Sequence, residues 1–335
     1  MRIRRVIISI LVICFIVAFC LSLHFYLKAL NINKGLTNDK PVSSSDYHFI
    51  LIPEEMDNPY WHLVEDGAKA AGAQADVAIE YKGPVQANVE EHIGAIDTAI
   101  ATKVDGIITQ GTVSPEMTAV INAAIQKGIP VITLDSDDPD SRRVAYIGTN
   151  NFKAGYQAGE ALIKATHGKA EVGIITGNFD STNEKQRVAG FEKAVSRARD
   201  VHIVDVEESH ITRVQAAEKT YNMLIKYPKI NAFFGTSSLD GIGISAIIEQ
   251  LDHKKDTYII AFDTLKETQT LIKKGAIDAT VSQDPYQMGY QSVLMMLDIL
   301  KGKQIKSLKY TDSQIIRASD LNISITHTHA EVKHK

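Results

Sequence analysis

Short apolar runs rich in β-branched residues alternate with amphipathic stretches along most of the chain. The apolar runs predict ten strands, at 47–52, 76–81, 105–109, 130–134, 143–147, 170–175, 201–206, 230–235, 257–262 and 278–282. Between them, apolar positions recur with helical period over 59–73, 86–102, 115–127, 151–166, 183–199, 212–227, 239–251, 265–274 and 285–301. Strands of a parallel sheet are covered on both faces, so their sequences are almost continuously apolar. The alternation therefore predicts an α/β fold with doubly wound parallel sheets.

Glycine and proline mark the ends of these elements. Lys127-Gly128 and Lys274-Gly275 close two helical patterns with a cation and then a glycine, as helix C-termini favour. Pro59, Pro115 and Pro285 stand where a first-turn proline is tolerated. Ten strands in about 280 residues are more than one sheet and one core usually hold. Two lobes are therefore expected.

The first 27 residues follow a different pattern. Arg2, Arg4 and Arg5 precede an uncharged apolar run, 6–23. A membrane span needs about 20 apolar residues, whereas a signal-peptide core has roughly 7–15. We therefore predict a signal anchor, a transmembrane helix within 1–27, with the arginines inside and the rest of the chain outside. The alternative is lipidation at Cys20. Either way, the body lies on the extracytoplasmic face of the cell membrane, after a polar tether at 28–45.

Composition excludes several classes of protein. The chain has 335 residues, of which 44% are hydrophobic and 23% charged, and a formal net charge of −4. This charge gives no sign of polyanion binding, so nucleic acid is not an expected partner. The two cysteines, Cys14 and Cys20, both fall in the apolar run, so the body has no disulfide and no cysteine metal site. The sequence also lacks a nucleophile-elbow serine, and the aspartates at 135–140 lack the glycine and glutamate of a calcium loop. We predict no enzymatic activity, no metal and no cofactor.

Polar side chains follow several of the predicted strands. Asp135 and Asp263 each end an apolar run, and Gln283 ends another. In parallel α/β sheets the ligand crevice lies beyond the carboxyl ends of the strands. Hydrogen-bond acceptors gathered there, without a nucleophile or metal cluster, indicate a site that binds a molecule rich in hydroxyl groups.

Over roughly residues 46–316 the sequence resembles the ribose-type periplasmic sugar-binding proteins, of the type 1 periplasmic binding protein fold, and more distantly the ligand-binding core of the lactose-repressor family. The motifs that carry this resemblance are Asn58-Pro59-Tyr60-Trp61, Asp66-Gly67-Ala68, 104–108, 128–135, Arg187-Val188-Ala189-Gly190-Phe191, Ala261-Phe262-Asp263 and 279–283. The resemblance implies two lobes joined by a hinge of three crossovers. The N-terminal lobe would comprise 46–148 plus 284–312 and the C-terminal lobe 149–283 plus 313–320, followed by a polar tail at 321–335.

The resemblance also implies which residues bind the ligand, with Arg187 and Asp263 expected at a water-filled crevice. The implied ligand-binding residues are Asn58, Tyr60, Trp61, Asp135, Arg187, Ser237, Phe262, Asp263 and Gln283. Aromatic rings would pack on the faces of a sugar, and the polar groups would bind its hydroxyls. The sequence departs from the ribose binders at Ser136, at Ser237-Ser238 and at Ile211, where an aromatic is common. Ribose specificity is therefore not implied.

These observations predict a membrane-anchored extracytoplasmic binding protein for a small sugar, a pentose, hexose or derivative. Its lobes would close on the ligand and signal to an integral-membrane partner such as a sensor histidine kinase. The alternative is the substrate-binding receptor of a sugar ABC transporter, which would deliver its ligand to a permease. A transcription factor of similar fold would need a DNA-binding segment where the apolar run stands. A Rossmann-type enzyme would need a glycine fingerprint that the sequence lacks.

Overall fold

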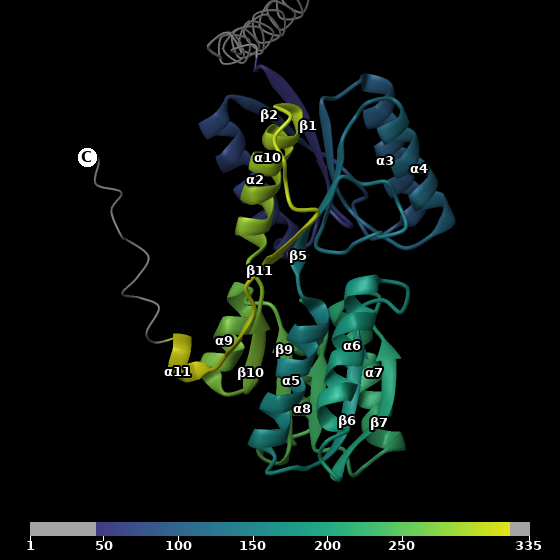
Figure 1. Cartoon of the computed structure of the whole chain (residues 1–335). Coiled ribbons are helices and arrows are strands. Elements are labelled where there is room, and N and C mark those ends of the chain that lie inside the picture. Colours follow the sequence, from purple (N-terminus) through teal and green to yellow (C-terminus); the bar gives the residue numbers. More distant parts are fainter. Residues whose placement is uncertain (1–44, 322–335) are drawn as a thin grey trace, which may run out of the picture. The chain divides into compact units, whose positions relative to one another are not determined.

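The computed structural model describes residues 45–321 (Figure 1). The predicted membrane span at 1–27, the predicted tether up to residue 44 and the tail after Leu321 lie outside the described residues. Within the part of the chain that is described, no helix is long and apolar enough to cross a membrane.

Twelve strands in the described range form two six-stranded sheets. The first sheet has the order β11-β5-β4-β3-β1-β2, and the second has the order β12-β10-β9-β8-β6-β7. The strands are β1 (Tyr47–Ile52), β2 (Val77–Tyr81), β3 (Gly106–Gln110), β4 (Val131–Leu134), β5 (Ala145–Thr149), β6 (Lys169–Thr176), β7 (Asp200–Glu208), β8 (Ala232–Gly235), β9 (Tyr258–Phe262), β10 (Ala279–Ser282), β11 (Leu308–Thr311) and β12 (Gln314–Ile316). All neighbours pair in parallel except β12, which runs antiparallel to β10. The prediction of two parallel-sheet lobes in an α/β fold is confirmed.

Helices connect the strands and cover the sheets. They are α2 (Pro59–Ala75), α3 (Val89–Thr102), α4 (Pro115–Gln126), α5 (Asn151–Ala165), α6 (Thr182–Val195), α7 (Arg213–Lys226), α8 (Asp240–Gln250), α9 (Lys266–Lys274), α10 (Pro285–Leu300), the short α11 (Ala318–Leu321) and a 3₁₀ turn η1 (Lys254–Asp256). Pro59, Pro115 and Pro285 all lie in first turns, as predicted. Each of these three helices also has a side-chain N-cap, which satisfies a backbone N–H that the helix leaves unpaired.

The chain passes between the two sheets three times. The passages follow β5, β10 and β11, and they lead into α5, α10 and β12 (Figure 1). As a result α10, late in the sequence, packs beside α2 on the first sheet. We call the first sheet with its helices the first lobe and the second sheet with its helices the second lobe. Apolar clusters lie on the two faces of each sheet, so each lobe has its own core.

Two strands were not predicted from the sequence. β11 and β12 are only four and three residues long, and most of their side chains are exposed or half-buried. They lie at the edges of the two sheets, where one side of the strand meets no neighbour. A strand in that setting needs no continuous apolar run, so its sequence carries little of the signal that marked the inner strands.

Candidate functional site

Two aspartates occupy matching positions in the two lobes. Asp135 follows β4 of the first lobe and Asp263 follows β9 of the second, and both have left-handed backbone, with φ of 64° and 65°. Aspartate adopts this conformation more readily than most residues. A neighbouring hydroxyl fixes each turn: Tyr146 donates to the Asp135 carbonyl and Thr280 to the Asp263 carbonyl, both at 2.7 Å. Each turn holds a carboxylate at the carboxyl end of its sheet.

The start of α2 supplies the aromatic side of the site. Asn58 caps the helix by accepting from Tyr60 N at 3.0 Å. Tyr60 donates its hydroxyl to Asp135 Oδ1 at 2.5 Å and meets Trp61 edge-on, with the ring centroids 5.5 Å apart. Trp61 is 2% exposed and belongs to the first lobe's apolar cluster. These rings therefore line the site and pack in the core at once.

Arg187 of α6 lies at the centre of the polar network. Its guanidinium donates to Asn151 Oδ1 at 2.9 Å and to the Thr236 carbonyl at 2.9 Å, and it pairs with Glu184 at 3.4 Å. The guanidinium also stacks on the Phe262 ring, 3.9 Å from its centroid. Arg187 is only 2% exposed, so its neighbours enclose the guanidinium in this structure, and the expectation that it borders a water-filled crevice in the free protein stays a prediction.

Gln283 connects this network to two of the passages between the sheets. Its Oε1 accepts from Thr149, where the chain leaves β5, at 2.6 Å and from Arg187 at 3.2 Å. Its Nε2 donates to Asp263 at 2.9 Å. One amide therefore joins both crossing segments to Asp263 and to Arg187.

These groups enclose a small polar cavity between the lobes, which we call the inner pocket, with a volume of about 30 Å³. It is lined by Glu54, Asn58, Tyr60, Trp61, Asp135, Asn183, Glu184, Arg187, Ile211, Ser237, Ser238, Asp263 and Gln283. Eight of the nine residues predicted from the sequence are among them. The ninth, Phe262, does not line this pocket; it is fully buried beneath Arg187 and supports the guanidinium from behind.

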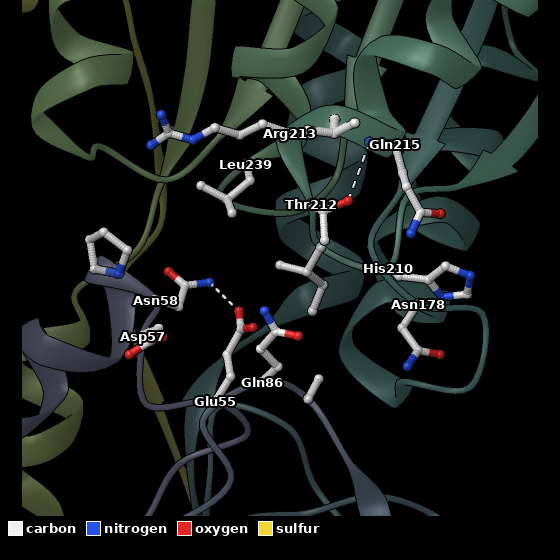
Figure 2. Close-up of a pocket in the computed structure, with 14 residues that line it drawn as sticks. Glu55, Asp57, Asn58, Gln86, Asn178, His210, Thr212, Arg213, Gln215 and Leu239 are labelled. Atoms are coloured by element: carbon white, nitrogen blue, oxygen red, sulfur yellow. Dashed lines mark hydrogen bonds between the residues drawn. The ribbon is translucent and has the colours of Figure 1, made fainter.

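A wider cavity of about 630 Å³, which we call the outer cavity, shares lining residues with the inner pocket. Figure 2 shows the side chains around the outer cavity. Asn58 and Ile211 line both spaces. Figure 2 shows Gln86 and Asn178 among the polar side chains around the outer cavity. The first lobe contributes the segments around Glu55 and Gln86, and the second lobe contributes the segment between β7 and α7 together with Asn178 and Leu239.

Direct hydrogen bonds join the lobes at the inner pocket. Asn58 donates to Ser238 Oγ at 3.2 Å, and Asn183 of α6 donates to Asp135 Oδ2 at 2.9 Å. Ser237 Oγ, in contrast, is buried in the same wall and has no hydrogen-bond partner among the described residues. An unpaired buried hydroxyl costs free energy unless a ligand or water satisfies it, so this atom is suited to contact a polar ligand.

The charge inside the pocket is unbalanced. Arg187 is the one cation among the residues that line it, and it faces the carboxylates of Glu54, Asp135, Glu184 and Asp263. Burial raises the pKa of Asp263 to about 7, although Arg187 and Gln283 act in the opposite direction. Burial also raises the pKa of Asp135. The pKa of the half-buried Glu54 rises to about 8 through desolvation and the neighbouring carboxylates of Glu55 and Asp135.

The pKa of Arg187 shifts in the direction opposite to the one that burial alone would cause. Burial by itself lowers the pKa of a guanidinium, but the carboxylates of Glu184 and Asp135 outweigh that effect and raise the pKa of Arg187. The guanidinium therefore stays charged and serves as a fixed fork of donors for neighbouring oxygens.

Glu54, Asn183 and Glu184 were missed by the sequence analysis, although the sequence carries signals for each. Glu54 follows the first strand with one proline between, much as Asp135 follows β4. Asn183 and Glu184 stand four and three residues before Arg187, which places them on the same face of α6. Within the described residues, no group of histidine, cysteine and carboxylate side chains could hold a metal ion.

Comparison with known proteins identifies the family of this chain. A family model described as a periplasmic binding protein domain matches residues 49–304, so the chain belongs to the periplasmic binding protein family. The ribose import binding protein RbsB of Escherichia coli (strain K12) is 24% identical over 272 residues, which are 79% of this chain and 89% of that protein. The resemblance to the ribose-type binding proteins is confirmed, as is the prediction that the chain is a binding protein and not an enzyme.

Two solved structures are more similar in sequence. A crystal structure of GanP, a glucose-galactose binding protein from Geobacillus stearothermophilus, is 53% identical with a TM-score of 0.80, and the match covers 82% of this chain and 98% of that one. The XylFII–LytSN complex contains a chain that is 36% identical with a TM-score of 0.78, at 82% and 98% coverage. Both matches span nearly the whole of the other chain, so the two-lobed body is common to all three proteins.

Proposed function

We propose that this protein is an extracytoplasmic receptor that binds a small sugar between its lobes and signals its presence to a membrane partner. The observation that carries the proposal is the inner pocket, where both lobes contribute hydrogen-bonding groups around one arginine. Asp135 and Asp263 would accept from neighbouring sugar hydroxyls, and Arg187 and Gln283 would donate to ring or hydroxyl oxygens. Tyr60 and Trp61 would meet the apolar face of the ring.

The charged groups of the pocket favour the binding of a ligand without net charge. Arg187, the one guanidinium among the lining residues, already pairs with Glu184, so an added phosphate or carboxylate on the ligand would find no unpaired cation there and would raise the pKa values of the neighbouring carboxyl groups further. We therefore expect neutral pentoses or hexoses to bind and their phosphorylated or uronic acid counterparts not to bind. GanP, at 53% identity, is a glucose-galactose binding protein, which makes these two hexoses the first ligands to test.

A thermal-shift screen of the purified full chain tests the sugar-binding proposal. A ligand that binds the folded state alone raises apparent stability by mass action, by about 2.7 kcal/mol at a concentration one hundred times Kd. The panel would contain D-glucose, D-galactose, D-ribose, D-allose and D-arabinose, with glucose 6-phosphate and galacturonic acid as charged controls. If no neutral sugar shifts the transition, or if a charged control shifts it as far, the proposal fails.

For the output of the receptor, we propose signalling through a sensor histidine kinase, with the body held at the membrane by the segment at 1–27. The XylFII–LytSN complex supports signalling, because there a chain 36% identical to this one is bound to a second protein. The alternative, delivery to an ABC permease, is favoured by the ribose import binding protein and by an ABC transporter solute-binding protein that is 26% identical. Adjacent genes discriminate the two: a kinase with a response regulator supports signalling, and a permease with an ATPase supports transport.

The anchor has a test of its own. The apolar run at 6–23 is long enough to span a membrane, and the bulky Phe19 precedes Cys20 where lipoprotein processing needs a small residue. We expect mass spectrometry of the membrane-extracted protein to show an unprocessed N-terminus. A lipid on Cys20, or a soluble chain that starts after Cys20, would contradict the membrane-spanning anchor and would favour the alternative of a transport receptor.

A further inference from the structure

The segment between β7 and α7 has an unusual backbone. His210 and Ile211 are consecutive and both have left-handed conformation, with φ of 48° and 54°. This region is strained for any residue with a Cβ and most of all for a β-branched one. Such strain persists only where the surrounding structure enforces it, and it is concentrated at functional sites.

Hydrogen bonds hold this strained segment in place. The Ile211 backbone N–H donates to Ser209 Oγ at 3.1 Å, and Ser209 Oγ donates to Asp240 Oδ1 at 2.5 Å. Asp240 is fully buried, and its other oxygen accepts from Ser237 N at 2.8 Å. The segment is therefore fastened to the same loop, before α8, that carries Ser237 into the inner pocket.

The side chain of Ile211 packs into the wall of the inner pocket. It is 8% exposed, and a Cβ added to Gly177, at the end of β6, would lie 2.9 Å from Ile211 Cγ1. Glycine at 177 therefore leaves the space that the isoleucine fills. Ile211 and Asn58 are the two residues that line both the inner pocket and the outer cavity. Ile211 belongs to the second lobe and Asn58 to the first, so each lobe contributes one side chain to the boundary between the two spaces.

We propose that Ile211 is the size filter of the binding site: with Asn58 it closes the inner pocket toward the outer cavity and limits the ligand to a single sugar ring. An extension of the ligand, such as a glycosidic substituent or a second ring, would have to pass between Ile211 and Asn58 to reach the outer cavity. Neither side chain can move aside easily, because Ile211 packs against Gly177 and Asn58 is held in place as the N-cap of α2. The inference rests on the proposed function and adds the ligand's size class to it.

Calorimetry on the full chain tests the filter with D-galactose, D-glucose, their methyl glycosides and lactose. We expect the wild-type chain to bind one of the free hexoses and to discriminate against its extended forms. We expect Ile211→Ala to lower the ratio of the affinity for the free hexose to the affinity for its extended forms at least tenfold, mainly because the extended sugars bind more tightly. Ile225→Ala is the matched control, since Ile225 lies in α7, the helix that follows this segment, is 64% exposed and lines neither cavity. It should leave the ratio unchanged.

Ile211→Gly gives a second readout that does not depend on a ligand. Glycine adopts positive φ without strain, whereas alanine does not. We expect the melting temperature of Ile211→Gly to equal or exceed that of Ile211→Ala, although glycine is the smaller residue. Ile211→Gly also removes the side chain from the pocket wall, so it replaces Ile211→Ala in the calorimetry if the alanine variant folds poorly.

The outcomes separate this inference from the proposed function. If the wild-type chain binds a free hexose but the ratio to its extended forms is the same in both Ile211 variants, the filter is refuted and the sugar receptor stands. Equal loss of affinity for free and extended sugars would also refute the filter, because Ile211 would then be a simple ligand contact. A wild-type chain that binds no sugar overturns the proposed function and the filter together.

Discussion

At the scale of single residues, the site depends on a buried arginine that has both a structural and a binding role. Arg187 compensates three neighbouring carboxylates, stacks on Phe262 and donates to oxygens of Asn151, Thr236 and Gln283. An arginine that only contacted ligand could be removed with little effect on the fold. Here its removal would leave buried carboxylates without a counter-charge.

Arg187→Ala should therefore abolish sugar binding and also destabilise the protein by about 3–5 kcal/mol, the usual cost of removing one partner from a buried ion pair. Urea denaturation measures the stability and calorimetry the binding. Lys185→Ala is the control, because Lys185 lies two residues away on the exposed side of α6 and should change stability by less than about 0.5 kcal/mol. An unchanged denaturation midpoint for Arg187→Ala would contradict the structural role.

The raised pKa of Asp263 predicts how stability depends on pH. The pKa of Asp263 moves from an ordinary 3.8 to about 7 because of burial, beside Arg187, Gln283 and Asp135. The folded ligand-free chain therefore holds this proton more tightly than the unfolded chain. Between about pH 4 and pH 7 the group's contribution to stability falls as the pH rises, by at most about 1.4 kcal/mol per pH unit.

We expect urea denaturation of the ligand-free chain to show a loss of stability from pH 5 to pH 7. Asp263→Asn removes this titration and keeps an acceptor for Gln283, so its stability should fall less steeply over the same range. If the two slopes are equal, Asp263 does not hold the proton. Asp240 and Glu54 also have raised pKa values, of about 7 and about 8, so some slope should remain in the variant.

At the scale of elements, close contact between α5 and α6 places Arg187. A Cβ added to Gly155 of α5 would lie 1.9 Å from the Arg187 carbonyl oxygen, which is backbone and cannot rotate away. Only glycine lets the two helices approach this closely. Gly155, which does not line the pocket, therefore determines how far the Arg187 guanidinium reaches into it.

Gly155→Ala should destabilise the protein by roughly 1–3 kcal/mol through overpacking and weaken sugar binding, because α6 must move away from α5. Gly94→Ala is the matched control. Gly94 is also in a helix, α3, but an added Cβ meets nothing within 4 Å, so alanine should stabilise by roughly 0.5–1 kcal/mol. Thermal melts and calorimetry on both variants check this pair. Opposite signs are expected, and a destabilised Gly94→Ala would count against the packing argument.

The elements also show what the sequence could and could not predict. Inner strands such as β3 and β4 are buried along their whole length, so an apolar run was sufficient to locate them. The edge strands β11 and β12 lacked that run and were missed. Asp135 and Asp263 could be predicted as site residues because they directly follow such runs. The burial of Arg187 could not, because it depends on the contact of α5 with α6, which no local pattern of α6 reveals.

At the scale of the whole molecule, the two lobes meet through the groups that would hold the ligand. Asn183 of the second lobe donates to Asp135 of the first, and Asn58 donates to Ser238 in the reverse direction. The inner pocket is small, with a volume of about 30 Å³, and these hydrogen bonds between the lobes lie among the side chains that line it. We therefore expect that a sugar enters as the lobes separate and that its binding replaces some of these contacts between the lobes.

This arrangement predicts an equilibrium between open and closed forms that the ligand shifts toward closure. Small-angle scattering of the full chain should show a more compact molecule with a saturating sugar than without it. An identical profile in the two conditions would exclude closure as the response to ligand.

Asn183→Ala tests whether the contacts seen here hold the ligand-free lobes together. The variant loses one hydrogen bond between the lobes, worth about 0.5–1.5 kcal/mol, which raises the ratio of open to closed molecules about two- to twelvefold. Its ligand-free scattering profile should shift toward the open form, and its profile with saturating sugar should return to the wild-type closed one. Asn222→Ala, on the exposed side of α7, is the matched control and should scatter like the wild type. If Asn183→Ala also scatters like the wild type without ligand, then the Asn183–Asp135 bond does not restrain the lobes, and closure depends on the sugar alone.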